Sequence, residues 1–195
     1  MGPGELRPTR QSPIPAATLA AAGLIASAAA SGSPQGAEWE TLDKPDGCMS
    51  CHLALPGGNS TESAGLVIEG LPTAVVPGRR YDLTIVLRDP ELLIGGFLLG
   101  ITSTSAGAGV AAGPDAGVLE AADDHSEAMG ARARSTRTGA LPTTPGELRW
   151  TLVWTAPSPL AAPVRFDLWG NAGNDDLSPL GDRIHHISLE LPAAD

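Results

Sequence analysis

The residues with the clearest chemical pattern in this sequence are Cys48, Cys51 and His52, which form a Cys-x-x-Cys-His run. This run is typical of covalent haem attachment, because two thiols three positions apart can each bond a vinyl group of the same haem. The histidine that follows is then close enough to bind the iron as its proximal ligand. The chain has no other cysteine, so a zinc site would lack a second cysteine pair. A small disulfide loop and a chance match of the pattern are the remaining alternatives. We therefore predict one covalently bound haem c at Cys48, Cys51 and His52.

A second axial ligand would decide the chemistry of that iron, and the sequence offers two candidates, Met129 and His125. Both fall in residues 123–130, which we expect to form an irregular segment able to cover the open side of the haem. A methionine opposite a histidine raises the reduction potential relative to two imidazoles. We predict Met129 or His125 as the distal iron ligand, with an open or water-filled position as the alternative. His185 is expected on the apolar face of its strand, in the core, and His186 on the opposite, solvated face.

Residues 1–30 have the pattern of a secretory signal peptide. Arg7 and Arg10 supply the positive start, residues 16–30 form an alanine-rich apolar stretch, and residues 28–30 supply the small side chains of a cleavage site. The apolar stretch is short and has no basic flank, which favours cleavage over a retained membrane helix. The sequence therefore predicts a periplasmic or extracellular protein with no stable membrane insertion after cleavage of the signal.

The chain is acidic, with 12 Lys and Arg against 22 Asp and Glu and a formal charge of −10. Such a surface repels nucleic acid, which we exclude as a partner, and it either favours a basic redox partner or keeps an exported protein soluble. No Ser, His and Asp arrangement for nucleophilic catalysis is recognisable, and both cysteines are assigned to haem. We therefore expect an electron carrier rather than an enzyme.

One segment near the C-terminus is rich in side-chain oxygen atoms that could bind calcium. Its members are Asn171, Asn174, Asp175, Asp176 and Asp182. Calcium loops end in a glutamate at a fixed spacing, which this segment lacks, and the same residue types also build tight turns. We therefore favour turn formation over a calcium site.

Most of the chain after the motif alternates apolar and polar residues with a period of two, which predicts half-buried strands. About seven or eight such strands, separated by turn residues, predict an all-β sandwich. The expected organisation is a signal peptide at 1–30, a flexible lead-in at 31–47, a haem-attachment loop at 48–60 and a β-sandwich at 61–192. The strands are expected at 65–69, 81–88, 94–102, 118–121, 132–138, 148–154, 164–168 and 185–191.

Several short motifs resemble those of reeler-like domains, and they occur in the same order along the chain. They include Val76-Pro77-Gly78, Tyr81-Asp82-Leu83-Thr84-Ile85, Gly96-Phe97-Leu98-Leu99, Trp154-Thr155-Ala156-Pro157 and Gly170-Asn171-Ala172-Gly173. The closer resemblance is to bacterial relatives named choice-of-anchor V domains, which also carry a Cys-x-x-Cys-His run before the first strand. It implies an Ig-like (reeler-like) β-sandwich with an N-terminal c-type haem-attachment loop. One departure is Arg137, which stands where these relatives often have a histidine.

Three functions are compatible with these observations. We favour an exported monohaem c-type cytochrome-like protein that transfers single electrons. A haem-based sensor or redox enzyme would instead need an open iron position and a distal group, for which Arg137 and His125 are candidates. An extracellular recognition or adhesion module would use its haem only structurally.

Overall fold

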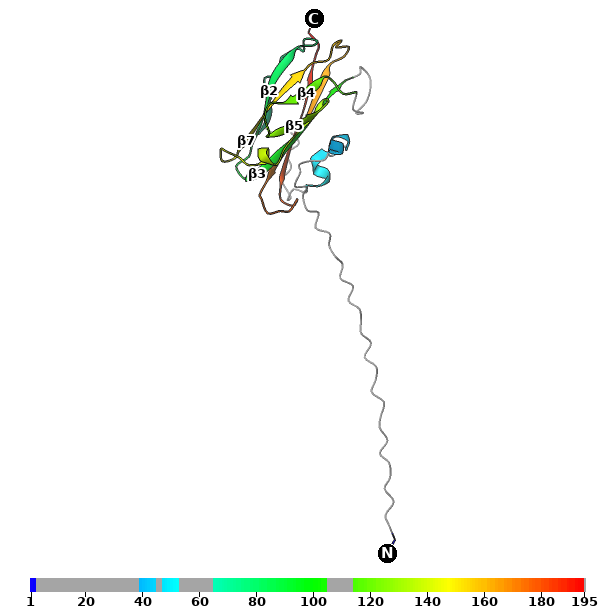
Figure 1. Ribbon diagram of the computed structural model, residues 1–195, viewed down its shortest axis with the longest axis vertical. Helices are drawn as coiled ribbons and strands as arrows, with labels where there is room; N and C mark the ends of the chain where they lie inside the picture. The colour runs from blue at the N-terminus through cyan, green and yellow to red at the C-terminus, as the bar shows by residue number, and fades with distance from the viewer. Residues whose placement is uncertain (3–38, 45–46, 53–64, 105–113, 195) are drawn as a thin grey trace.

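A computed structural model describes residues 1–2, 39–44, 47–52, 65–104 and 114–194 of the chain. In these residues nine strands form two antiparallel sheets that pack face to face as a β-sandwich (Figure 1). Residues 3–30 of the predicted signal peptide, most of the predicted lead-in and residues 53–60 of the predicted haem-attachment loop lie outside the described residues. No helix within the described ranges is long and apolar enough to cross a bilayer.

The two sheets contain four and five strands. The four-stranded sheet has the order β1-β2-β7-β4, and the five-stranded sheet has the order β5-β6-β3-β8-β9. In the first sheet β1 is Leu66–Glu69, β2 is Arg80–Arg88, β7 is Glu147–Thr155 and β4 is Val118–Ala121. In the second, β5 is Ser126–Met129, β6 is Arg132–Ser135, β3 is Ile94–Ser103, β8 is Val164–Gly173 and β9 is Arg183–Leu191. The all-β sandwich expected from the sequence is confirmed.

The period-two pattern places one face of each long strand in the core. On β7 the side chains of Leu148, Trp150, Leu152 and Trp154 are buried, whereas Arg149 and others between them are not. The antiparallel register sets Trp154 opposite Tyr81, so the apolar faces of β7 and β2 coincide. Alternation of this kind specifies register, because a shift of one residue would turn every apolar side chain towards solvent.

Aromatic rings join the two sheets at the centre of the core. Trp154 of the first sheet contacts Phe166 of the second edge-on, with ring centroids 5.0 Å apart. Phe97 contacts Trp150 at the same centroid distance. The indole N–H groups of these two tryptophans also have acceptors: Trp150 donates to the Gly139 carbonyl at 2.8 Å and Trp154 to the Ala116 carbonyl at 3.1 Å. The core therefore combines ring packing with satisfied polar groups.

The structure corrects two expectations about strands. Nine strands are present in the described residues rather than seven or eight, because residues 123–130 are not irregular: they contain β5. β5 is polar and has no apolar alternation of its own; it forms by pairing with β6 through a turn at Gly130, whose φ is +62°. β6 also ends at Ser135, earlier than predicted, and a short 3₁₀ helix, η3 (Thr138–Ala140), follows it.

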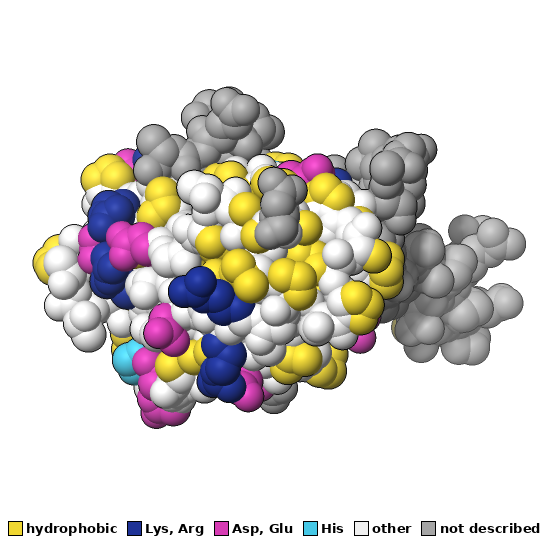
Figure 2. All heavy atoms as spheres, turned by 90° about the horizontal axis from the view of Figure 1, so that it is seen from above, with side chains coloured by type: hydrophobic (Ala, Val, Ile, Leu, Met, Phe, Trp, Pro, Cys, Tyr) yellow, Lys and Arg dark blue, Asp and Glu magenta, His cyan; other side chains and the backbone are white. Residues whose placement is uncertain are grey.

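Ion pairs cross the outer face of the four-stranded sheet. Arg80 contacts Glu120 at 2.8 Å, and Arg88 contacts Glu147 at 2.7 Å. In the space-filling view, basic side chains likewise lie next to acidic ones (Figure 2). The arginines of this sheet are therefore locally neutralised, which agrees with an acidic protein that offers no basic stripe over these strands.

Two 3₁₀ helices lie against the outside of the five-stranded sheet, where Figure 1 shows them beside the sandwich. They are η1 (Trp39–Asp43) and η2 (Gly47–Ser50). η1 packs over β3 and β6: Leu42 covers Gly100, and the Arg132 guanidinium binds Asp43 at 2.9 Å. η2 packs over β8 and carries the first residues of the Cys-x-x-Cys-His run. The sandwich therefore holds the motif on an outer sheet face.

Candidate haem-attachment site

The Cys-x-x-Cys-His run forms a single helical turn. The backbone N–H groups of Cys51 and His52 both donate to the Cys48 carbonyl oxygen, at 3.3 Å and 3.1 Å. Cys51 and His52 lie three and four positions after Cys48 in this turn, and the two cysteine side chains differ in exposure: Cys48 is buried and Cys51 is exposed. Neither cysteine is in a disulfide. The turn brings the three residues of the motif together in one short segment.

Cys48 anchors the turn to the sheet. Its side chain is only 7% exposed and packs in a small cluster with Leu98, Trp169 and Ile184. The preceding residue, Gly47, has a φ of +48°, and a Cβ at that position would lie 2.3 Å from the Trp169 ring. Only glycine allows the turn to approach the indole this closely.

The two thiols have different environments. Burial, with a smaller contribution from the neighbouring Cys51, raises the pKa of Cys48 to about 12. Cys51 is exposed. Because the thiolate is the reactive form, the two cysteines of the folded polypeptide should differ in reactivity.

We expect an alkylating reagent at pH 8 to modify Cys51 at least about 100-fold faster than Cys48 in folded protein made without haem. Peptide mass spectrometry after timed labelling measures both rates. Denatured protein, in which both thiols are exposed, is the control and should lose the difference. Equal rates in the folded protein would contradict the burial of Cys48.

His52 is held by two residues of the β8–β9 region. Its Nδ1 lies 2.6 Å from the carboxylate of Asp182. Asp182 directly precedes β9, and its side chain is almost fully buried. Asn171, near the end of β8, donates its amide N–H to the same carboxylate oxygen at 3.1 Å. Among the described residues, no hydrogen bond or ion pair engages Nε2 of His52. The ring is thus fixed through one nitrogen, and the other remains available to a metal.

Asp182 and Asn171 are functional candidates that the sequence assigned only to a turn-rich, oxygen-bearing segment. The rest of that segment does form turns: the Asp176 backbone N–H donates to Asn174, and the Ser178 backbone N–H donates to Asp176. No group of three or more acidic, His or Cys side chains in the described ranges is arranged to hold a metal ion.

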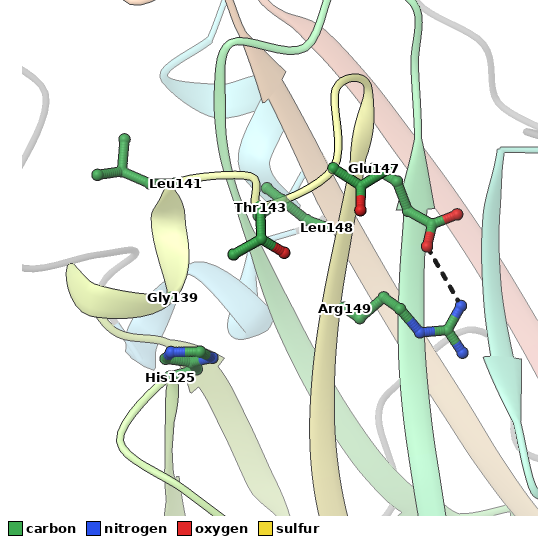
Figure 3. Close-up of a pocket in the computed structure, with 8 residues that line it drawn as sticks. His125, Gly139, Leu141, Thr143, Glu147, Leu148 and Arg149 are labelled. Carbon is green, nitrogen blue, oxygen red and sulfur yellow. Dashed lines mark hydrogen bonds and ion pairs between the residues drawn. The ribbon is translucent and has the colours of Figure 1, made fainter.

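The structure does not bring Met129 or His125 next to His52. Met129 is exposed on β5, three strands away from β8 in the sheet order, and η1 covers the intervening strands β6 and β3. His125 lines a small pocket of about 90 Å³ at another place, together with Gly139 and Arg149 (Figure 3). The identity of a distal ligand therefore stays a prediction.

The two strand histidines differ in environment as their alternation suggests. His185 is buried, as expected, and its Nε2 lies 3.1 Å from the Asp89 carboxylate. His186, expected to be a solvated surface residue, is instead only partly exposed and stacks on Trp169, with ring centroids 3.9 Å apart. The reason is cross-strand pairing: His186 lies opposite Trp169 in the β8–β9 register, on the face that η2 covers.

Comparison with known proteins identifies the fold. No family model matches the chain, and no curated protein sequence matches it. Among solved structures, the Reelin-N domain of F-spondin matches with a TM-score of 0.50 and 16% identity, over 76% of this chain and 96% of that one. A human F-spondin reeler domain matches with a TM-score of 0.49 and 15% identity, over 73% and 97%.

The chain is therefore a β-sandwich of the reeler-like type. At 16% identity the likeness concerns the fold alone. The chemistry of the protein must therefore be argued from the residues of the site.

Proposed function

We propose that this protein is an exported, c-type cytochrome-like carrier of single electrons, with one haem bound covalently through Cys48 and Cys51. The observation that carries the proposal is the hydrogen bond between His52 Nδ1 and the Asp182 carboxylate, 2.6 Å long. Histidines that bind metals almost always donate their other ring N–H to a carboxylate or carbonyl. His52 has this arrangement already, and it follows two cysteines in one turn.

The residues of the motif fit the group that the proposal requires. Cys48 and Cys51 would hold the haem through thioether bonds, each sulfur bonding to one vinyl carbon while the thiol proton goes to the other. His52 would hold the iron through Nε2. The bound haem would supply one-electron exchange at its iron, and the protein would contribute the position of the haem and the hydrogen bond between His52 and Asp182.

The burial of Cys48 sets an order of events for such attachment. With Cys48 packed against Trp169, its sulfur is covered by the protein. The haem must therefore react with Cys48 before η2 packs on β8. Maturation before final packing agrees with attachment during export, which the signal-like residues 1–30 support. The acidic surface favours a basic partner protein as electron donor or acceptor.

A second function, a haem-based sensor or redox enzyme, is favoured by one specific observation. Neither predicted distal ligand, Met129 or His125, lies beside His52. An iron with an open sixth position binds small molecules, whereas a six-coordinate iron is suited to electron transfer. The ultraviolet–visible spectrum of the ferrous protein with and without carbon monoxide separates the two functions.

The proposal is tested by producing the full chain in bacteria that carry a c-type cytochrome maturation system. We expect the purified protein to carry one haem that acidic acetone does not extract, with a matching increase in mass. Cys51→Ala should lose one thioether bond and most of the covalent haem. Met49→Leu, a change of similar volume between the two cysteines, is the matched control and should keep the haem. Unmodified wild-type polypeptide from such cells would refute the proposal.

A further inference from the structure

We propose that Asp182 is a positioning residue that orients the His52 imidazole and strengthens its electron donation to the iron, which lowers the reduction potential of the haem. The inference rests on the proposed function and extends it to the control of the iron. It assigns a role to a residue 130 positions away from the motif.

The first step is the position of the carboxylate. Asp182 is 5% exposed and lies in the loop that enters β9. It is close to the sheet: a Cβ on Gly173 would lie 3.3 Å from the second carboxylate oxygen, Oδ1. A carboxylate held in this way cannot turn away from His52 into water. Hydrogen bonds to an ionised acceptor are about twice as strong as neutral ones, and burial strengthens them further.

The second step is the role of Asn171. Its amide N–H donates to the same Asp182 oxygen that accepts from His52, at 3.1 Å. Its amide oxygen is buried and has no hydrogen-bond partner among the described residues. A reversed amide would place that oxygen against the carboxylate, which is repulsive, so the amide orientation is fixed by Asp182. Asn171 therefore stabilises the Asp182 carboxylate, and it also competes with His52 for the electron density of the shared carboxylate oxygen.

The third step is the consequence for the iron. A hydrogen bond from Nδ1–H to a buried carboxylate gives the imidazole partial anionic character, and hydrogen bonds of this kind raise the basicity of a metal-binding histidine. An electron-rich imidazole stabilises the ferric state more than the ferrous state, since ferric iron carries the larger charge. Asp182 should therefore lower the potential, and Asn171 should moderate that effect.

The experiment measures the reduction potential of the haem-bearing protein and of three variants. We expect Asp182→Asn to shift the ferrous-to-ferric ratio at least about tenfold in favour of the ferrous state, equivalent to about 59 mV for one electron. Asn171→Ala should shift it in the opposite direction, because the carboxylate loses a competing donor. Asp175→Asn is the matched control: it removes the same charge from an exposed position in the same loop, with a positive φ that asparagine tolerates.

A second readout reports the ligand itself. The iron–imidazole stretching frequency, recorded by resonance Raman after photolysis of the ferrous carbon monoxide complex, should fall in Asp182→Asn and stay constant in Asp175→Asn. A merely structural role for Asp182 would not produce opposite potential shifts in Asp182→Asn and Asn171→Ala.

The outcomes are distinct. Covalent haem with an unchanged potential and stretching frequency in Asp182→Asn overturns the inference and leaves the proposed function intact. If Asp182→Asn does not accumulate as folded protein, the Asn171→Ala variant decides, because a potential that does not fall there also overturns the inference. A wild-type protein without covalent haem, seen by mass, refutes the proposed function and the inference together.

Discussion

Replacing Trp154 with alanine is expected to lower the free energy of unfolding by about 3–5 kcal/mol. The side chain is fully buried in β7 and connects the two sheets: it stacks on Tyr81 of β2 and meets Phe166 of β8 edge-on. Truncation leaves a cavity between the sheets and also removes the indole N–H that binds the Ala116 carbonyl. Both effects act in the same direction, since a buried carbonyl without a donor is itself destabilising.

Urea denaturation followed by far-ultraviolet circular dichroism measures this loss as a lower midpoint with an unchanged slope. Trp154→Phe keeps an aromatic ring between Tyr81 and Phe166, so its destabilisation should be smaller. Thr151→Ala, at an exposed position of the same strand, controls for strand propensity and should change stability by less than about 0.5 kcal/mol. A Trp154→Ala protein as stable as Thr151→Ala would mean that this ring does not join the sheets.

The strands that the sequence predicts best are those with one strongly apolar face. Alternation in residues 81–88 and 148–154 identifies β2 and β7 to within a residue or so at their ends, because burial of one face fixes both the strand and its register. β5 is not predictable in this way. Ser126–Met129 has no apolar face of its own, and its strand conformation depends on pairing with β6, including the ion pair between Glu127 and Arg134.

The residues of the candidate site also differ in whether the sequence alone can predict them. Cys48, Cys51 and His52 are readable because their chemistry depends on spacing within one turn. The partner of His52 is not readable, because Asp182 is one of several acidic residues in a turn-rich segment and nothing local distinguishes it. Its contact with His52 exists only because η2 packs on β8 and the β8–β9 connection returns beside it. Long-range pairing of this kind follows from the fold rather than from a local pattern.

The same region of the fold depends on a buried carboxylate, Asp89, and we expect Asp89→Ala to cost about 3 kcal/mol of stability. Asp89 is 3% exposed and follows β2. One of its oxygens lies 3.1 Å from both His185 Nε2 and the Arg183 guanidinium, and the other accepts the Glu91 backbone N–H at 2.9 Å. The carboxylate thereby ties the first sheet to the start of β9, the strand that Asp182 immediately precedes.

The expected loss of stability in Asp89→Ala depends on which charged groups lose their partner. Burial lowers the pKa of His185, so this imidazole is neutral at pH 7 and donates to Asp89 without adding a buried charge. Removing Asp89 leaves Arg183 with its other ion pair, to Glu91 at 3.3 Å, and the Arg183 side chain is 39% exposed and can reach water. The loss should thus lie at the lower end of the range of about 3–5 kcal/mol seen when one member of a buried pair is removed.

Asp123→Ala is the matched control for Asp89→Ala. Asp123 accepts the backbone N–H of the residue two positions later, as Asp89 does, at the same distance of 2.9 Å, but it is exposed and contacts no buried histidine. Its loss should cost about 1 kcal/mol, the value of one turn hydrogen bond. Urea denaturation of both variants at pH 7 separates the turn contribution, which they share, from the buried contacts to β9, which only Asp89 makes. Equal losses in the two variants would show that Arg183 and His185 contribute nothing through Asp89, and that β9 begins where it does because of its pairing with β8 alone.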